Sequence, residues 1–320
     1  MEKIKREAVN SIAQRKRNNC LGEFRRNKVL YLMTLPAIIL VFIFSYIPMF
    51  GIVMAFKDNK SAAGYFSGNW VGFQNFEFFF RSNDAARITF NTIFLNALFI
   101  ISVLVVSLSL ALLLNELSKR WLVKTYQSVM FFPHFLSWVI IGFLTFAFLS
   151  VDNGFINKIL IALGREPVYW YSNPNYWPFI LTIVNLLKNA GYYCIIYYAG
   201  ITGIDQDLYE AASIDGASRF RRMISITIPS IMPLISVMVL LQIGKIFYAD
   251  FGLFYYVPRE TGVLFPRTDV IDTYAFRALR VLGNTGMSAA IGLFQSFVGF
   301  VLVLVSNLIT KKINSDNALF

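Results

Sequence analysis

The sequence predicts an all-α polytopic membrane protein with six transmembrane helices. Hydrophobic residues make up 57% of the 320 residues, charged residues only 15%, and the mean hydropathy is +0.58. Soluble domains carry roughly 25% charged residues, so a soluble protein of this size and composition would be hard to keep in solution. Several apolar runs also reach the roughly 20 residues that a helix needs to cross a bilayer.

Six apolar stretches are long enough to be spans. The first is far longer than the apolar part of a signal peptide, so we expect a retained anchor. Prolines interrupt the first, third and fifth spans, which a membrane helix tolerates when neighbouring groups satisfy the freed backbone. We expect one membrane domain over residues 29–312, after a basic arm (1–28) and before a short tail (313–320). The predicted spans cover approximately residues 29–56, 89–115, 128–150, 177–203, 225–250 and 285–310.

The distribution of basic residues predicts the orientation. An even number of spans places both termini on one side, and that side carries 17 Lys and Arg residues against 10 in the opposite loops. Lys and Arg collect in cytoplasmic loops. The arm, the tail and both termini are therefore expected in the cytoplasm. The net charge of +11 is explained by this topology, and a nucleic-acid partner is not expected.

The stretch EAASIDGASRFRRMISITIP (210–229) is unusually polar for a link between two spans. Acidic residues such as Asp205 and Asp207 suit the first turn of a helix, where the helix dipole is positive. Ala211 and Ala212 favour a helix and allow another surface to approach closely, and Gly216 permits a turn. The stretch predicts two short helices with a bend at the membrane surface. The alternative is a solvated loop that merely joins two spans.

The same stretch resembles a known family. Glu210-Ala211-Ala212, three residues, Gly216, nine residues and then Ile226 to Pro229 are similar to the EAA motif of membrane subunits of binding-protein-dependent ABC importers. The family pattern ends in Ile-x-Leu-Pro, where this chain has Ile228. The resemblance covers essentially the whole chain. WVGFQNFEFFF (70–80) and NTIFLNALF (91–99) look like the carbohydrate-uptake branch, similar to permeases for complex and pectin-derived (rhamnogalacturonan-type) oligosaccharides.

The resemblance implies a bacterial cell membrane location, a mechanism and a set of partners. A cytoplasmic coupling helix docks in a cleft of a separate ATPase, through Glu210, Ala211, Ala212, Asp215 and Gly216. The implied partners are a second, distinct permease subunit, two ATPase subunits, an extracellular solute-binding lipoprotein, membrane lipid and an oligosaccharide. ATP and Mg²⁺ would be bound by the ATPase, and no cofactor or metal is expected in this chain.

The chain's own residues agree that it is not an enzyme. A P-loop needs Gly-x4-Gly-Lys-Ser/Thr, whereas Gly244-Lys245 is followed by Ile246 within a predicted span. A membrane-embedded enzyme would need a convergent acid–base set, and His134 has no HExxH partner or nearby carboxylate in the sequence. A secondary transporter would need coupling carboxylates within the spans, but Asp250 lies at a span end.

Lys188 and Lys245 lie within predicted spans and mark a candidate solute path. Charged side chains inside a membrane are energetically costly and usually have a function. The alternative is that each lysine snorkels or pairs with a partner such as Asp250. If the lysines face the path, an acidic, uronate-containing oligosaccharide is favoured by attraction, and a neutral oligosaccharide is the alternative. The helical spacing puts Asn185, Lys188, Asn189 and Tyr192 on one face of the fourth span, with Gln242 and Lys245 in the fifth.

Aromatic residues before the fourth span predict an interfacial belt, since Trp and Tyr collect where the membrane meets water. The residues concerned are Trp170, Tyr171, Tyr176 and Trp177.

Overall fold

The computed structural model describes residues 26–58 and 68–313. Its contacts divide the chain into two units, residues 1–54 and residues 55–320. Most of the predicted arm and all but the first residue of the predicted tail lie outside the described residues. Within the described ranges every regular element is a helix, apart from one isolated bridge between Lys57 and Trp70. The predicted all-α class is therefore confirmed.

The first unit contains the first predicted span. Helix α2 (Lys28–Val41) continues into the π-helix η1 (Phe42–Tyr46) and the 3-10 helix η2 (Ile47–Phe56), whose last residues belong to the second unit. The combined stretch from Lys28 to Phe56 is long and apolar enough to cross a membrane. This agrees with the predicted first span, 29–56.

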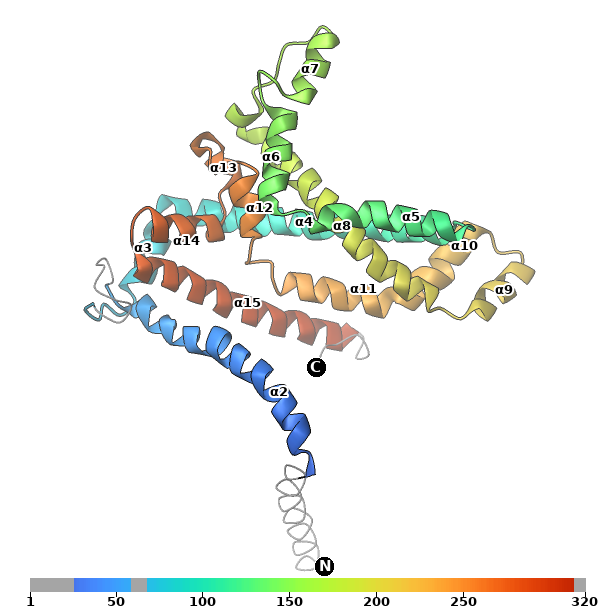
Figure 1. Ribbon diagram of the computed structural model, residues 1–320, viewed down its shortest axis with the longest axis horizontal. Helices are drawn as coiled ribbons and strands as arrows, with labels where there is room; N and C mark the ends of the chain where they lie inside the picture. Colours follow the sequence, from blue (N-terminus) through green and yellow to red (C-terminus); the bar gives the residue numbers. More distant parts are fainter. Residues whose placement is uncertain (1–25, 59–67, 314–320) are drawn as a thin grey trace, which may run out of the picture. The chain divides into compact units, whose positions relative to one another are not determined.

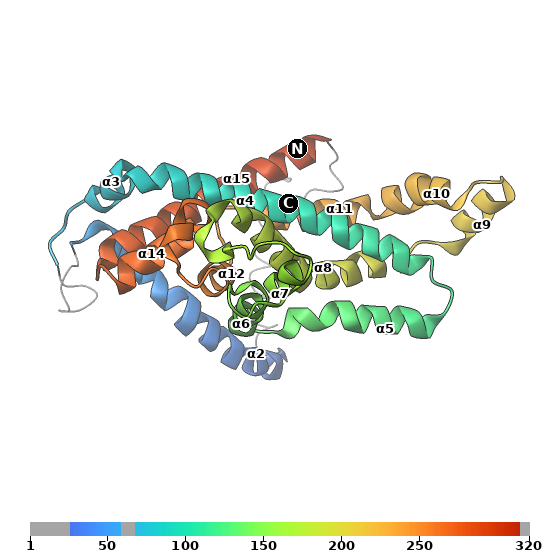
Figure 2. The same cartoon turned by 90° about the horizontal axis from the view of Figure 1, so that it is seen from above.

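The second unit is built around two long helices, α4 (Asn83–Asn115) and α8 (Trp177–Thr202), which pack along each other. Helix α5 (Arg120–Phe131) packs on α8 and runs beside it (Figures 1 and 2). The contact is close at Gly191, where an added Cβ would lie only 2.0 Å from the carbonyl oxygen of Met130. Glycine is required there because any side chain would push the two helices apart.

Two further helices complete the set of spans. They are α11 (Ile228–Ile243) and α15 (Thr285–Ile313), which pack against each other. By length and composition, five stretches of the described chain can cross a membrane, and a sixth arises if one bent pair of helices counts as a single span. The bent pair, Arg120–Phe135 and Trp138–Leu149, follows the second span in the chain. If it is counted as one span, the described chain has six spans in the predicted order.

The third span is not the continuous helix predicted over 128–150. Helix α5 runs into the 3-10 helix η3 (Phe132–Phe135), and α6 (Trp138–Leu149) then leaves at an angle of 99° (Figure 1). Pro133 has no N–H group and cannot continue the α-helical hydrogen bonds. Ser137 then caps the new helix by accepting a hydrogen bond from the Ile140 N–H at 3.3 Å. Local sequence thus ends one helix and starts another.

The fifth span lies earlier in the chain than the predicted 225–250, because the stretch that can cross a membrane runs from Arg219 to Ile243. Helix α11 ends at Ile243, residues 244–247 form turns, and residues 248–250 have no regular structure. The side chain of Asn96, on α4, donates hydrogen bonds to the carbonyls of Ile246 (2.8 Å) and Tyr248 (3.4 Å). These bonds satisfy backbone groups that a continued helix would have satisfied itself.

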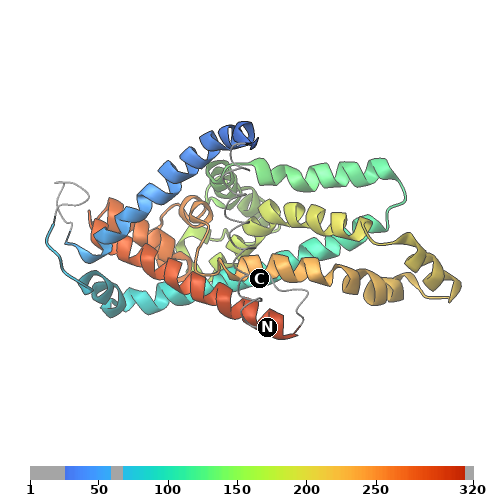
Figure 3. The same ribbon diagram turned by 90° about the horizontal axis from the view of Figure 1, so that it is seen from below.

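The loop before α11 contains α9 (Gln206–Ile214), α10 (Arg219–Arg222) and the π-helix η6 (Met223–Thr227). These elements lie at one end of the second unit, and α3 (Gln74–Arg81) and α14 (Ile271–Arg280) lie at the other (Figures 1, 2 and 3). The separation agrees with the predicted placement of these segments on opposite sides of a membrane. The remaining short helices are α7 (Phe155–Ala162), η4 (Trp170–Ser172), η5 (Pro174–Tyr176), α12 (Phe251–Tyr256), η7 (Gly262–Leu264) and α13 (Phe265–Thr268).

One aromatic prediction is wrong. Trp177 is not an interfacial belt residue, because its side chain is fully buried and its Nε1–H donates to the carbonyl of Trp170 at 2.9 Å. It belongs to the core that α4, α8 and α12 share. Trp177 is the first residue of α8, where a membrane helix meets the interface, so its sequence position alone could not distinguish a core residue from a belt residue.

Candidate functional site

The polar loop forms the predicted pair of short helices with a bend. Asp205 caps α9 by accepting a hydrogen bond from the Asp207 N–H at 3.1 Å. At the other end, Gly216 has φ +75°. Its N–H donates to the carbonyl of Ser213 (3.1 Å), and the Ala217 N–H donates to that of Ala212 (2.9 Å). This pair of bonds is the Schellman motif, which favours glycine in the left-handed position.

The predicted contact residues lie on the accessible side of this loop. Glu210, Ala211, Asp215 and Gly216 are exposed, and Ala212 is half-buried. Ile214, at the end of α9, is 87% exposed, which is unusual for an aliphatic side chain. The loop therefore offers small and apolar groups beside acidic ones, a surface suited to a protein partner.

Two contacts tie the loop to the ends of the spans. The Tyr209 hydroxyl and the Thr227 hydroxyl are 2.8 Å apart, and Thr227 is buried in the π-helix η6. Arg219 Nη1 lies 3.3 Å from Glu116 Oε2, next to the end of α4. A polar cavity of about 340 Å³ separates the loop from the ends of α4 and α8 between these contacts. A displacement of the loop can therefore reach η6 through Tyr209 and the end of α4 through Arg219.

Four of the six predicted path residues meet in one cavity. Its volume is about 250 Å³, and it lies among α4, α8 and the end of α11. We call it the path cavity. Its lining is mixed: Phe99, Ile100 and Val103 of α4 are apolar, whereas most of the other lining residues carry amide, hydroxyl or charged groups. The predicted residues in it are Asn185, Asn189, Gln242 and Lys245, and Asn96, Tyr193, Tyr248 and Asp250 line it as well.

The polar groups of the path cavity are partly unsatisfied. Asn189 Nδ2 donates to Asn185 Oδ1 at 2.8 Å, which fixes one amide against the other. Gln242 Nε2 is buried and has no hydrogen-bond partner among the described residues. A buried donor without a partner is costly unless a ligand or water completes it. The arrangement fits a ligand that presents hydroxyl groups.

Lys188 is engaged differently from the prediction. Its Nζ donates to the carbonyl of His134 at 3.0 Å and also to that of Leu136, the two carbonyls at the break in the third span. It also lies 5.0 Å from the centre of the Trp138 ring, and Trp138 Nε1 donates to Asp250 Oδ2 at 2.9 Å. Lys188 does not line the path cavity, and its contacts favour the structural alternative, with backbone carbonyls as partners.

Tyr192 also lies outside the path cavity. Its ring stacks on that of His134, with 4.8 Å between centroids, and His134 stacks in turn on Phe131 at 5.6 Å. The three rings fill the space beside the break. The helical spacing correctly put Tyr192 near Lys188, but both residues point toward the bend of the third span.

Sequence reasoning missed several residues at this site. Asn96 and Asp250 line the path cavity, and an isolated amide in the second span was the available signal for Asn96. Asp272 was not singled out either. Its Oδ2 accepts hydrogen bonds from the Ala249 N–H (2.8 Å) and from Gln295 (3.1 Å), which anchors the turn after the fifth span. Burial raises the pKa of Asp272, and the two hydrogen bonds oppose that shift.

Among the described residues no group of three His, Cys, Asp or Glu side chains is placed to hold a metal ion.

Comparisons with known proteins relate this arrangement to a family. Residues 104–315 match the family described as binding-protein-dependent transport system inner membrane component. Protein LplB of Bacillus subtilis is 36% identical over 296 residues, which cover 92% of each chain. The polygalacturonan/rhamnogalacturonan transport system permease protein YteP of the same organism is 36% identical over 301 residues, covering 94% of this chain and 93% of the relative.

A solved structure has the same fold. A chain of a bacterial ABC transporter involved in the import of the acidic polysaccharide alginate superposes with a TM-score of 0.84 and 33% identity, covering 92% of this chain and 99% of the other. These relatives are transport subunits, which confirms that the chain is a permease component and not an enzyme. With its multi-pass helical architecture and its EAA-type loop, the chain belongs to the family of binding-protein-dependent transport system inner membrane components.

Proposed function

We propose that this chain is a permease subunit of an ATP-driven importer in a bacterial cell membrane, and that it translocates an oligosaccharide. The observation that carries the proposal is the path cavity, where Asn185, Asn189, Gln242 and Lys245 meet between the fourth and fifth spans. Amide groups both donate and accept hydrogen bonds, so they suit the hydroxyl groups of a sugar. The two spans flank the coupling loop, so its movement can reach the cavity.

The coupling part of the proposal concerns the loop from Glu210 to Gly216. Glu210, Ala211, Ala212, Asp215 and Gly216 would contact an ATPase subunit, where ATP and Mg²⁺ bind. The exposure of α9, its contact with η6 through Tyr209 and the contact of α10 with the end of α4 through Arg219 support this role. We further propose a distinct second permease, two ATPase copies and an extracellular solute-binding lipoprotein as partners. Both termini would be cytoplasmic, as the charge bias supports.

The substrate class proposed is an acidic, uronate-containing oligosaccharide. Support comes from relatives whose names refer to polygalacturonan, rhamnogalacturonan and alginate. Within the chain, the Lys245 ammonium lies at the path cavity and has no ion pair with another described residue. Asp250 lines the same cavity and offsets part of that charge. A neutral oligosaccharide is the alternative substrate.

The test is ATP hydrolysis by the reconstituted complex with its binding protein, using trigalacturonate and neutral oligosaccharides as ligands. Stimulation by trigalacturonate alone supports the acidic substrate. Stimulation by neutral sugars keeps the oligosaccharide importer and removes the acidic assignment. If no ATPase subunit purifies with the chain, the coupling role of Glu210 to Gly216 is wrong.

A further inference from the structure

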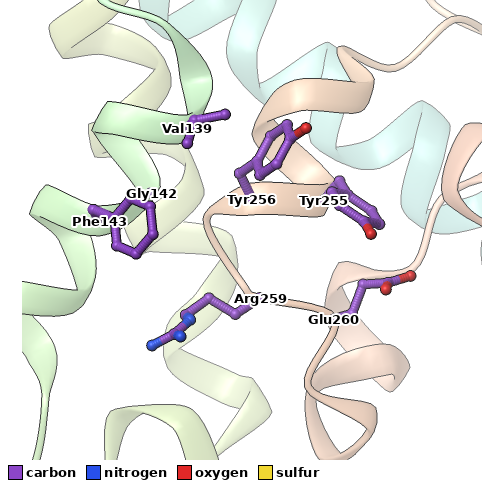
Figure 4. Close-up of a pocket in the computed structure, with 7 residues that line it drawn as sticks. All are labelled: Val139, Gly142, Phe143, Tyr255, Tyr256, Arg259 and Glu260. Atoms are coloured by element: carbon purple, nitrogen blue, oxygen red, sulfur yellow. The ribbon is translucent and has the colours of Figure 1, made fainter.

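A second cavity lies further along the short helix α12. Asp250 caps the start of α12 and lines the path cavity, whereas Tyr255 and Tyr256, at its end, line a cavity of about 190 Å³. A helix rises about 1.5 Å per residue, so the two ends of α12 are roughly 9 Å apart. The remaining lining residues come from α6 and from the turn after α12 (Figure 4): Val139, Gly142, Phe143, Arg259 and Glu260.

The turn that closes this second cavity has an unfavourable backbone. Arg259 has φ +59° and Glu260 has φ +48°, and they are the only residues other than glycine with positive φ in the described ranges. A Cβ atom disfavours this left-handed region. Such outliers persist where the surroundings impose them, and they cluster at functional sites. Folding alone would favour glycine or asparagine at both positions.

The two charged side chains of the turn point to opposite sides (Figure 4). The Arg259 guanidinium lies over the ring of Phe146, 4.1 Å from its centroid, and forms no ion pair with another described residue. Glu260 instead extends on the side of Tyr255, away from Arg259. Arg259 is exposed, so its planar group can reach a carboxylate supplied from outside.

We propose that this cavity is a second carbohydrate subsite, where Arg259 pairs with the carboxylate of a uronate unit and Tyr255 and Tyr256 pack against the sugar. The inference rests on the proposed function and deepens it, because it assigns recognition of the acid group to Arg259 more than to the lysines. A guanidinium matches a carboxylate with two parallel hydrogen bonds. Aromatic faces supply apolar contact area for the sugar ring.

The decisive variant is Arg259→Gly. Glycine accepts the left-handed backbone, so this change removes the guanidinium while relieving strain. Glu260→Gly relieves the same kind of strain and serves as the stability reference, so both variants should melt at or above the temperature of the unaltered complex. Arg267→Gln is the charge control, because Arg267 is exposed on α13 and lines neither cavity.

The measurement is made on the whole importer in nanodiscs with its binding protein. With trigalacturonate, Arg259→Gly should lower stimulated ATP hydrolysis about tenfold or more, the equivalent of one lost charged contact. Arg267→Gln should stay within about twofold of the unaltered complex, as exposed substitutions do. Arg259→Lys keeps the positive charge but lacks the planar guanidinium, so its stimulated ATP hydrolysis should lie between those of Arg259→Gly and Arg267→Gln.

Saturation-transfer NMR of trigalacturonate on the complex without binding protein gives a second readout. Loss of the sugar signal in Arg259→Gly supports the subsite. An unchanged signal and unchanged ATP hydrolysis in a stably folded Arg259→Gly complex overturn it, and so does an equal loss for neutral and acidic sugars. If no oligosaccharide stimulates the unaltered complex, the proposed substrate class itself fails, which is a separate result.

Discussion

Replacing Lys188 with methionine tests whether its ammonium supports the broken third span. The substitution keeps an unbranched apolar side chain and removes the donor to the carbonyls of His134 and Leu136. A hydrogen bond to a charged group contributes about 1.5–3 kcal/mol net. Two such bonds would give about 3–6 kcal/mol, and because they share one ammonium we take the lower bound. We expect Lys188→Met to lower the free energy of unfolding by about 3 kcal/mol.

The assay is unfolding of the purified chain in mixed micelles by titration with sodium dodecyl sulfate. Lys245→Met is the matched control for stability, because the Lys245 side chain is exposed and has no hydrogen bond or ion pair to the described part of the chain. We expect that control to stay within about 0.5 kcal/mol. The reasoning is refuted if Lys188→Met is as stable as Lys245→Met while uptake of acidic solutes falls selectively, since Lys188 would then act in the solute path.

Three other substitutions test further parts of the structure. Gly216→Ala adds a Cβ that meets no atom within 4 Å, but alanine is strained at the φ of +75° found there. We expect this variant to lose about 1–2 kcal/mol of stability and to have a lower ratio of uptake to ATP hydrolysis. An unchanged ratio would contradict the proposed coupling role. Asp272→Ala leaves the Ala249 N–H and Gln295 without their acceptor and should cost about 1–3 kcal/mol, measured by thermal unfolding, whereas Asp272→Asn should cost less. Because burial raises the pKa of Asp272 above its ordinary 3.8, the folded state binds the proton more tightly than the unfolded state. Its contribution to stability is therefore complete below pH 3.8 and declines as the pH rises through the raised pKa, a decline that Asp272→Asn should remove. Gln242→Leu removes a buried amide nitrogen without a partner among the described residues, so thermal stability should hold or rise while uptake falls; full uptake would exclude Gln242 from the path.

The spans could be predicted because hydrophobic length decides them. Five predicted spans correspond to helices of nearly the predicted extent, since a run without charges has few alternatives in a bilayer. The 99° bend could not be predicted. Pro133 signalled a disturbance, but many membrane helices continue past a proline. Lys188, 52 to 54 residues away in the chain, donates hydrogen bonds to the carbonyls of the break, and this long-range contact could not be predicted from the residues around Pro133.

The candidate sites were predictable to different degrees. The bend at Gly216 follows from local chemistry, so the sequence was sufficient to place it. The path residues needed tertiary information. Helical spacing put Asn185, Lys188 and Asn189 on one face, but that face is wide enough to serve both the path cavity and the broken span. Its two amides line the cavity, and its ammonium turns to the break.

The π-helix η6 sets the rotational position of the loop that contains α9 relative to α11. The N–H of Ile228 bonds to the carbonyl of Met223, five residues back, so one turn holds one residue more than an α-helical turn. Each residue of an α-helix corresponds to about 100° of rotation. Deleting one residue from 223–227 would restore an α-helix and turn the whole loop by about that angle around the axis of α11. A single-residue deletion there would therefore change only the direction of the loop around the axis of α11. Every side chain of α9 would be kept, but Glu210 and Ile214 would face a new direction.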